Sequence, residues 1–392
     1  MARSHWLIVL TVAVAALVLW QGAKSVSQER PAGLPGARPA IDAATYPNLQ
    51  AALDALPSTG GVVHLPAGTF EINEPLRITQ EDVLIAGAGT ATHIKNVNTS
   101  GQPAIVIESP QLTDNPRATL WRVQLENLRI TGNEKSGHGI HARRIDEMFL
   151  HGITISYHGG DGLRLDNCYE DPRICDCLFT YNKACGVNLI GCHDIVVVGN
   201  QFEENLDALR CADGFNLCMT GNNLDDHLRD GVVIENTYGS VVSGNMIEEC
   251  SGRAVVLDRD CYGITLSSNV IAHEVLGGID LIDAHGCAVS ANTFTIVKQN
   301  ALRIGPASDR ITVTGNNFSS SHIGDAKDKR AENDRSASGI VLAGTSDIAI
   351  TGNVFSGLST KAVALEGNQA PSRVLFTNNV LAEVESDLKQ SP

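Results

Sequence analysis

Apolar and polar positions alternate in short runs along most of this chain, and one four-residue run returns at a nearly constant spacing. The run reads small, aliphatic, any residue, aliphatic, and its ten copies start at Gly139, Gly162, Gly186, Ala208, Gly231, Ala254, Gly278, Ala301, Gly339 and Ala362. Successive copies lie 22 to 24 residues apart, except for one step of 38 residues before Gly339. Such alternation places the aliphatic side chains on one face of a β-strand and the intervening residue on the other.

A second column of the repeat reads β-branched, any residue, Gly, Asn, any residue, aliphatic. Its asparagines are Asn200, Asn222, Asn245, Asn269, Asn292, Asn316, Asn353 and Asn379. We expect them at a turn, where Asn tolerates the left-handed backbone conformation and can bond its stacked neighbours. Two markers with one period predict one coil of short strands per repeat. The predicted fold is therefore all-β, a single-stranded right-handed parallel β-helix of about 10–12 coils over residues 41–385.

The ends of such a stack must be capped. The stretch Thr45–Leu56 predicts an N-terminal capping helix over about residues 46–56, with Thr45 as its N-cap and Pro47 at its first position. The long step of the repeat contains a charged stretch at residues 319–338, which we expect to be a loop insertion beside one coil. Residues 386–392 are expected to form a tail.

The N-terminus carries an export signal. Arg3 precedes Trp6–Trp20, a run of fifteen residues in which Thr11 is the only polar one. This length is typical of a signal peptide and is shorter than the ~20 residues of a spanning helix. Residues 1–27 are therefore predicted to be a signal peptide, or an uncleaved anchor that tethers the chain to a membrane through residues 6–20. A Pro/Gly linker follows at residues 28–40. We expect a secreted, periplasmic or cell-surface protein.

Net charge restricts the kinds of binding partner to expect, and the cysteines restrict the kinds of metal site and disulfide. The formal net charge of −15 argues against nucleic acid as a partner, and favours a soluble monomer. Ten cysteines in an exported chain suggest disulfides, and none of their spacings matches a zinc site. Cys168, Cys192 and Cys261 share a corner position that small residues occupy in other coils, so we expect them to pack in the core. Cys168 and Cys192 fall on adjacent coils and could pair.

The outward position of the first column gives one side chain per coil on a single face. It reads His141, Arg164, Asn188, Arg210, Val233, Val256, Asp280, Arg303, Val341 and Ala364. Turns just before these strands add Tyr157, His158, Asp161, Tyr181 and Lys183. Basic residues are therefore concentrated on about four neighbouring coils of an acidic protein, as a groove for an acidic polysaccharide requires. The alternative is an ordinary solvated face with salt bridges.

Three segments near the N-terminus carry a family resemblance. Asn48–Ala55, Gly60–Phe70 and Val83–Gly89 resemble the N-terminal cap and first coils of the pectate-lyase-like superfamily, and the similarity extends over roughly residues 41–385. The resemblance implies the β-helix fold and a polysaccharide partner. It does not select an activity, because the superfamily contains lyases, hydrolases, epimerases and proteins of no known reaction.

Our first hypothesis is a lyase or C5-epimerase that acts on a uronate-containing polysaccharide. Proton removal next to a uronate carboxylate needs a cation to hold the developing charge, a base and an acid. Arg164 or Arg210 would neutralise the carboxylate, and His141 or His158 would move the proton, with Asp161 beside them. The family's lyases and epimerases divide the work in this way. Residues predicted to bind the substrate are Tyr157, Tyr181, Lys183, Asn188 and Arg303.

Two other functions stay open. The same face could bind a glycan or a partner without catalysis. A glycoside hydrolase would use paired carboxylates, either Asp161 with Asp166, or Asp258 with Asp280 and Asp283. Specific family signatures are missing: the Asp-Pro-His motif of mannuronan epimerases is absent, and Gly137-His138-Gly139 resembles one element of polygalacturonases without its partners. We expect no cofactor and no metal. A calcium site built from the same aspartates is the alternative, although no loop has a recognisable ligand order.

Overall fold

A computed structural model describes residues 34–319 and 337–391 of the chain. Residues 1–38 and 39–392 form two separate compact units. The predicted signal or anchor segment and residues 28–33 of the predicted linker lie outside the described residues, as do residues 320–336 of the predicted insertion. Of the first unit only a short turn is described, in which the Ala37 N–H bonds to the Leu34 carbonyl at 2.9 Å.

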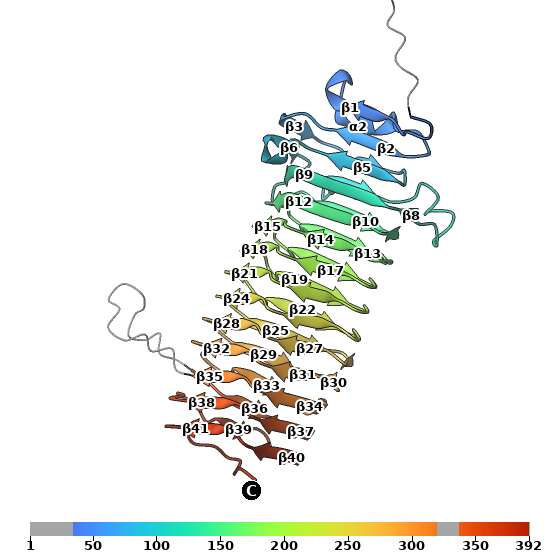
Figure 1. Cartoon of the computed structure of the whole chain (residues 1–392). Coiled ribbons are helices and arrows are strands. Elements are labelled where there is room, and N and C mark those ends of the chain that lie inside the picture. The colour runs from blue at the N-terminus through green and yellow to red at the C-terminus, as the bar shows by residue number, and fades with distance from the viewer. Residues whose placement is uncertain (1–33, 320–336, 392) are drawn as a thin grey trace, which may run out of the picture. The chain divides into compact units, whose positions relative to one another are not determined.

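The second unit is a solenoid of parallel strands with three walls (Figure 1). Wall 1 is a twelve-stranded sheet made by the first column of the repeat. Its strands are β4 (Leu76–Ile78), β7 (Ile105–Ile107), β10 (Ile140–Arg143), β13 (Leu163–Asp166), β16 (Val187–Ile190), β19 (Leu209–Ala212), β22 (Val232–Glu235), β25 (Arg253–Asp258), β29 (Gly277–Leu281), β33 (Leu302–Ile304), β36 (Ile340–Leu342) and β39 (Val363–Leu365).

Walls 2 and 3 belong to one 27-stranded sheet that bends at the asparagine corner. Wall 2 consists of β1 (Ala40–Asp42), β2 (Gly61–His64), β5 (Val83–Ala86), β9 (Val123–Thr131), β12 (Phe149–Ser156), β14 (Arg173–Cys175), β17 (Val196–Val198), β20 (Cys218–Thr220), β23 (Val241–Ser243), β27 (Thr265–Ser267), β31 (Ala288–Ser290), β34 (Asp309–Thr314), β37 (Ser346–Thr351) and β40 (Ser372–Thr377).

Wall 3 consists of the second halves of β9 and β12 together with β3 (Gly68–Ile72), β6 (Thr92–Asn96), β15 (Leu178–Thr180), β18 (Gln201–Glu203), β21 (Asn223–Asp225), β24 (Met246–Glu248), β28 (Val270–Ala272), β32 (Thr293–Thr295), β35 (Asn317–Ser319), β38 (Val354–Ser356) and β41 (Val380–Ala382). The corner between walls 1 and 2 adds β8 (Leu120–Trp121), β11 (Ile145–Asp146), β26 (Cys261–Tyr262) and β30 (Ala284–His285).

The predicted parallel β-helix is thus confirmed, but the number of coils was too low. Wall 2 has one strand from each of about 14 coils, against the 10–12 expected. The additional coils lie between Ala40 and Thr131, where neither column of the repeat is recognisable. Their strands still place Val63, Ile85 and Leu125 in the core, so the fold needs only the alternation and not the two markers.

The N-terminal cap is shorter than predicted. Its helix, α2, runs only over Leu49–Asp54, and its N-cap is Asn48, whose side chain accepts the Ala51 N–H at 2.8 Å. Thr45 instead ends the 3₁₀ turn η1 (Ala43–Thr45), which Asp42 caps. A second 3₁₀ turn, η2 (Gly89–Ala91), precedes β6. Buried Leu49 and Leu53 cover the first coil.

The asparagine corner holds the coils in register. Asn200 donates from its backbone N–H and from Nδ2 to Oδ1 of Asn222 on the next coil, both at 3.0 Å. Nδ2 also donates to the Ile174 carbonyl of the preceding coil at 3.0 Å. The same contacts continue to Asn379. We expected the asparagine to take the left-handed conformation, and this was wrong: that conformation belongs to the residue before it, such as Gly199 at φ +68°.

All ten cysteines are described, and none of them forms a disulfide. Cys168, Cys192 and Cys261 are completely buried at the corner between walls 1 and 2, as the repeat predicted. Their thiols contact backbone carbonyls of the corner, for example Cys192 Sγ to the Leu165 carbonyl at 3.4 Å. These cysteines are therefore packing residues of the core.

Candidate functional site

Wall 1 presents the predicted polar column on its outer surface. His141, Arg164, Asn188 and Arg210 pair in register from β10 to β19, so their side chains stand on four adjacent coils roughly 4.8 Å apart. The structure therefore brings these four predicted site residues together. Arg303 lies four coils beyond Arg210, on β33, and does not belong to the same cluster.

Asp166 is the centre of this cluster. His141 Nε2 lies 2.8 Å from Oδ2 of Asp166, and Arg164 Nε donates to both of its carboxylate oxygens at 3.1 Å. Burial opposes ionisation of Asp166, but the hydrogen bonds from His141 and Arg164 lower its pKa below the ordinary value. An ionised Asp166 holds the Nε2–H tautomer of His141, which leaves Nδ1 as a proton acceptor. The sequence had suggested Asp166 only as a carboxylate of a hydrolase, and did not predict it as the partner of His141.

His138 lies beside this group and was also missed. Its ring centroid is 5.4 Å from that of His141. Nδ1 of His138 accepts the backbone N–H of Asp161 at 2.9 Å, so the neutral ring carries its proton on Nε2. Burial lowers the pKa of His138, which favours this neutral form. The signal was the Gly137-His138-Gly139 motif, but its partners elsewhere in the sequence were missing.

Asp161 has a structural role in the same corner. It is 3% exposed, and its two oxygens accept the Cys185 N–H and Asn188 Nδ2, both at 3.0 Å. Equivalent positions on later coils do the same: Asp207 accepts the Asp230 N–H at 3.1 Å. Each of these carboxylates joins one coil to the next. Asp161 and Asp166, the pair considered for hydrolysis, therefore both already have hydrogen-bond partners.

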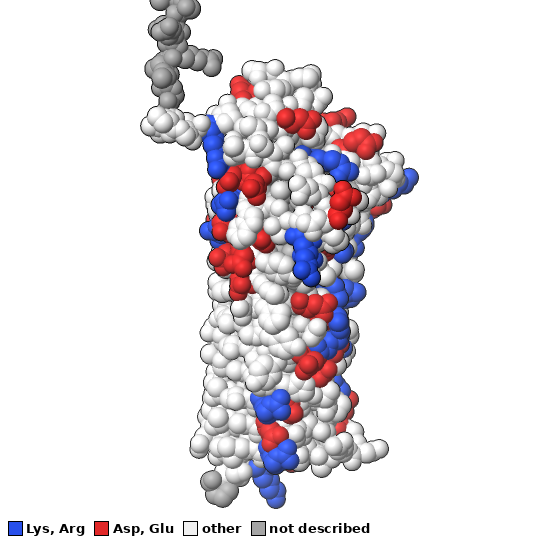
Figure 2. All heavy atoms as spheres, turned by 90° about the vertical axis from the view of Figure 1, so that its right-hand side faces the viewer, with Lys and Arg blue, Asp and Glu red and all other residues white. Residues whose placement is uncertain are grey.

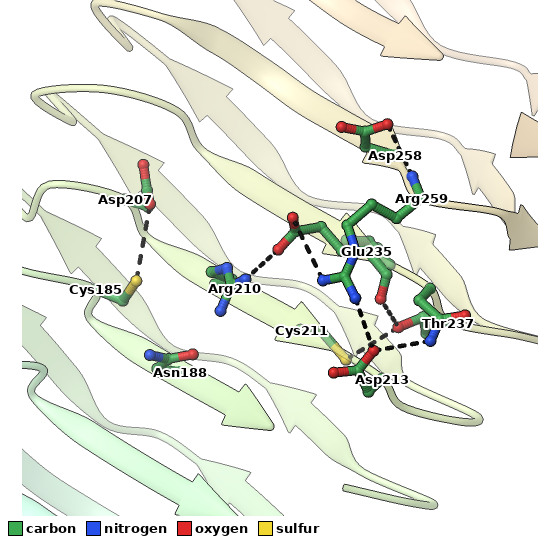
Figure 3. Close-up of polar contacts among 12 residues, drawn as sticks. Cys185, Asn188, Asp207, Arg210, Cys211, Asp213, Glu235, Thr237, Asp258 and Arg259 are labelled. Carbon is green, nitrogen blue, oxygen red and sulfur yellow. Dashed lines mark hydrogen bonds and ion pairs between the residues drawn. The ribbon is translucent and has the colours of Figure 1, made fainter. Parts of the chain in front are cut away.

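Arg210 is neutralised by a neighbouring acid (Figure 3). It forms an ion pair with Glu235, which Arg259 also approaches at 3.8 Å, and Arg259 contacts Asp213 at 3.2 Å. Farther along the wall, Asp280 lies 2.9 Å from Arg253 and 3.6 Å from Arg303, and Arg303 also contacts Glu366. The salt-bridge alternative thus holds for this part of the face. Figure 2 shows positive and negative side chains intermixed in a band along the solenoid.

His158 does not lie on the surface. It is completely buried in the corner between walls 3 and 1, where its backbone N–H donates to Asn182 Oδ1 at 3.2 Å and its Nε2 has no partner among the described residues. Burial lowers its pKa to about 3. The prediction that His158 exchanges a proton with a substrate is therefore corrected: it was taken from a turn, where the sequence does not determine which way a side chain points.

The predicted binding residues of the turns are exposed but lie on the corner of walls 3 and 1. Tyr157 and Tyr181 stack with centroids 5.0 Å apart and an angle of 9° between ring planes, and Tyr157 is 54% exposed. Lys183 pairs with Glu134 at 3.1 Å in solvent. The tyrosine pair thus forms an aromatic edge beside the coils that carry His141 and Arg164.

One acidic group has the geometry to hold a cation. Asp225, Asp226 and Glu249, on the same corner, bring their carboxylate oxygens within 4.8 Å of one another. These are not the aspartates considered from the sequence. Exposed carboxylates of this kind also occur without an ion, so this group is a candidate Ca²⁺ site by charge alone.

The comparisons with known proteins agree with this architecture. Residues 77–224 and 173–318 match the family described as "Right handed beta helix region". The chain belongs to this right-handed β-helix family. No curated protein sequence matches it. Among the described residues, no helix is both long and apolar enough to cross a membrane.

Three solved structures are similar to this β-helix chain. The catalytic unit of the GH87 alpha-1,3-glucanase from Streptomyces thermodiastaticus is 15% identical, with a TM-score of 0.61 over 91% of this chain and 71% of that one. Tailspike protein 3 of bacteriophage CBA120 is 12% identical, with a TM-score of 0.56 over 97% and 70%. ORF18 of Geobacillus virus E2 is 14% identical, with a TM-score of 0.43 over 86% of this chain, which spans only 61% of ORF18. At these identities the likeness to the glucanase and to the tailspike shows the fold alone.

Proposed function

We propose that this β-helix acts on a polysaccharide lying along wall 1, and that it transfers a proton at a uronate residue as a lyase or C5-epimerase. The observation that carries the proposal is the group formed by His141, Arg164 and Asp166 on adjacent coils. The similarity to an alpha-1,3-glucanase supports a polysaccharide as the partner, and does not select the reaction.

The chemistry follows from the hydrogen bonds of the group. Asp166 fixes the imidazole of His141 so that Nδ1 can take the proton from the carbon next to a uronate carboxylate. Arg164 contacts Asp166 through Nε, and no described residue accepts a hydrogen bond from its two terminal nitrogens. Those nitrogens are placed to hold the carboxylate as charge develops on it. The neutral His138 donates a hydrogen bond from Nε2–H to the oxygen that leaves in a lyase, and the imidazolium of His141 returns its proton to that oxygen.

The test uses polyuronates of different composition, such as alginate and pectate. We expect an unsaturated product that absorbs in the ultraviolet for a lyase, or deuterium uptake at C5 from D₂O for an epimerase. His141→Ala should lower the rate by about 10²- to 10⁴-fold. His151→Ala is the matched control, because His151 also pairs with an aspartate, Asp176 at 3.3 Å, but lies on wall 2 and should leave the rate unchanged.

The other outcomes point to the two alternatives. New reducing ends without unsaturation or deuterium uptake would overturn the proposal in favour of hydrolysis. Binding of the polysaccharide without any product would instead establish a glycan-binding protein, for which the charge-compensated coils from Arg210 to Arg303 offer a ready surface. We also propose that the chain is secreted or tethered to a membrane, because a polysaccharide long enough to lie along wall 1 is found outside the cytoplasm.

A further inference from the structure

Wall 3 carries an arginine without a counter-ion near the N-terminal end of the solenoid. Arg129 points outward from β9, is half-buried, and its Nε is sealed from solvent without a hydrogen-bond acceptor among the described residues. Every outward arginine of wall 1 described above has a carboxylate partner. A half-buried guanidinium that lacks one is unusual in a chain with a net charge of −15.

Hydrogen-bonding side chains surround this guanidinium. His93 pairs in register with Arg129 on the preceding coil, and Thr154 does so on the following coil. His93 Nε2 lies 2.7 Å from the hydroxyl of Thr131, and its Nδ1 lies 3.5 Å from the hydroxyl of Thr69. The patch therefore combines one fixed charge with several groups that can donate a hydrogen bond to an oxygen atom.

The electrostatic balance of the patch is positive. Lys95, one coil before Thr131, is matched by Glu71 at 2.8 Å, but that pair is exposed and contributes little. Burial lowers the pKa of His93 most. The positive charges of Arg129 and then Lys95 lower it further, because they repel a protonated imidazole. An anion bound beside Arg129 would remove that repulsion.

We propose that Arg129, Thr131 and His93 form a binding site for an oxyanion, the carboxylate or sulfate group of an acidic saccharide. A guanidinium offers two parallel N–H groups that match a carboxylate or a sulfate edge, and the threonine hydroxyl supplies a third donor. The site lies on wall 3 at β6 and β9, and the proposed catalytic group lies on wall 1 (Figure 1). It does not depend on the proposed reaction.

The experiment measures the pKa of the His93 ring by NMR, with the resonance assigned from a His93→Asn variant. Sodium sulfate should raise this pKa saturably, while sodium chloride at the same ionic strength should raise it only by screening. In Arg129→Gln we expect the apparent sulfate affinity to fall about tenfold, as expected for the loss of one charge-assisted contact. Arg117→Gln is the matched control, since Arg117 is exposed and unpaired among the described residues.

Separate titrations with galacturonate, its oligomers and inorganic sulfate identify the source of the anion. Tighter binding of the oligomers than of either small anion would assign the site to an acidic polysaccharide, and tightest binding of sulfate would assign it to a sulfated or free anion. An equal response to sulfate and chloride, or an unchanged sulfate response in Arg129→Gln, would overturn the inference. His141→Ala should retain the sulfate response, so that failure of the wall-1 proposal is distinguishable from failure here.

Discussion

At the scale of single residues, Glu274 is a buried carboxyl group whose hydrogen-bonding capacity the described core leaves unused. It is completely buried in the corner between walls 3 and 1, and neither of its carboxylate oxygens has a hydrogen-bond partner among the described residues. Burial raises its pKa to about 9, so the side chain is a neutral acid at pH 7. The same corner contains His158 and His227, whose pKa values burial lowers to about 3 and about 4.

Glu274 makes the stability of the solenoid depend on pH. The folded pKa lies above the unfolded value of about 4.5, so the contribution of Glu274 to stability is greatest below pH 4.5 and is lost as pH rises toward 9. The two buried histidines, His158 and His227, have the opposite dependence, because their contribution is lost as pH falls below the unfolded value of about 6.5. The loss amounts to about 3 kcal/mol between pH 4.5 and 7. We therefore expect the stability of the wild type relative to Glu274→Gln to fall by this amount over that range, as measured by urea unfolding at several pH values. Glu203→Gln, a half-exposed change on wall 3, should keep the pH dependence of the wild type; equal slopes in both variants would contradict the assignment.

Residue-level predictions from the sequence succeeded where alternation holds. It placed His141, Arg164 and Asn188 on one face because they lie inside strands. It failed for His158 because a turn sets the direction of that side chain. Which acid neutralises which arginine could not be read from the sequence either: Glu235 reaches Arg210 from the next coil, and such a contact depends on side-chain rotamers.

At the scale of elements, the asparagine corner is the main device that fixes register. Each inner asparagine donates twice to one neighbouring coil and once to the other, so removing one leaves several buried groups without partners. The sequence predicted this ladder from its spacing. It did not predict that the preceding residue, usually a glycine, takes the left-handed conformation in place of the asparagine, because glycine and asparagine both tolerate it.

Substitution at the middle of the ladder should be costly. We expect Asn269→Ala to lower the free energy of unfolding by about 3 kcal/mol, since it leaves the donors of Asn245 unsatisfied in the core. Asn223→Ala is the control: Asn223 is half-exposed on wall 3 and bonds only Gln201, so its loss should cost less than about 1 kcal/mol. Urea denaturation measures both, and a similar cost for the two would refute this account.

At the scale of the whole molecule, the solenoid is a stack in which each coil mainly contacts its neighbours. The period of the repeat predicted this architecture with its three-walled coils, and the weak markers before Gly139 explain why the coils of the N-terminal region were undercounted. The fold does not constrain the residues on the outer face of a stack, so a few outward side chains determine which ligand binds. That is why the sequence predicts the fold with more detail than the function.

A stack of this kind should tolerate the loss of one complete coil. Deleting residues 232–254 joins Gly231 to Val255, which occupies the position in register with Val232. We expect the shortened chain to keep its β-sheet circular dichroism and one cooperative unfolding transition. Deleting residues 232–243 instead shifts the inward and outward sides of the next coils, and should prevent folding. If both deletions were tolerated alike, register would not be what specifies the stack.

The asparagine ladder also has a direction. From Asn200 to Asn353 each asparagine donates its backbone N–H to the Oδ1 atom of the next asparagine, and the last of them, Asn379, donates its backbone N–H to Gln390 Oε1 at 2.9 Å. A stack that ended at an earlier coil would therefore leave these N–H groups without an acceptor. Gln390, which we had assigned to a tail, supplies the acceptor that the last asparagine of the ladder needs.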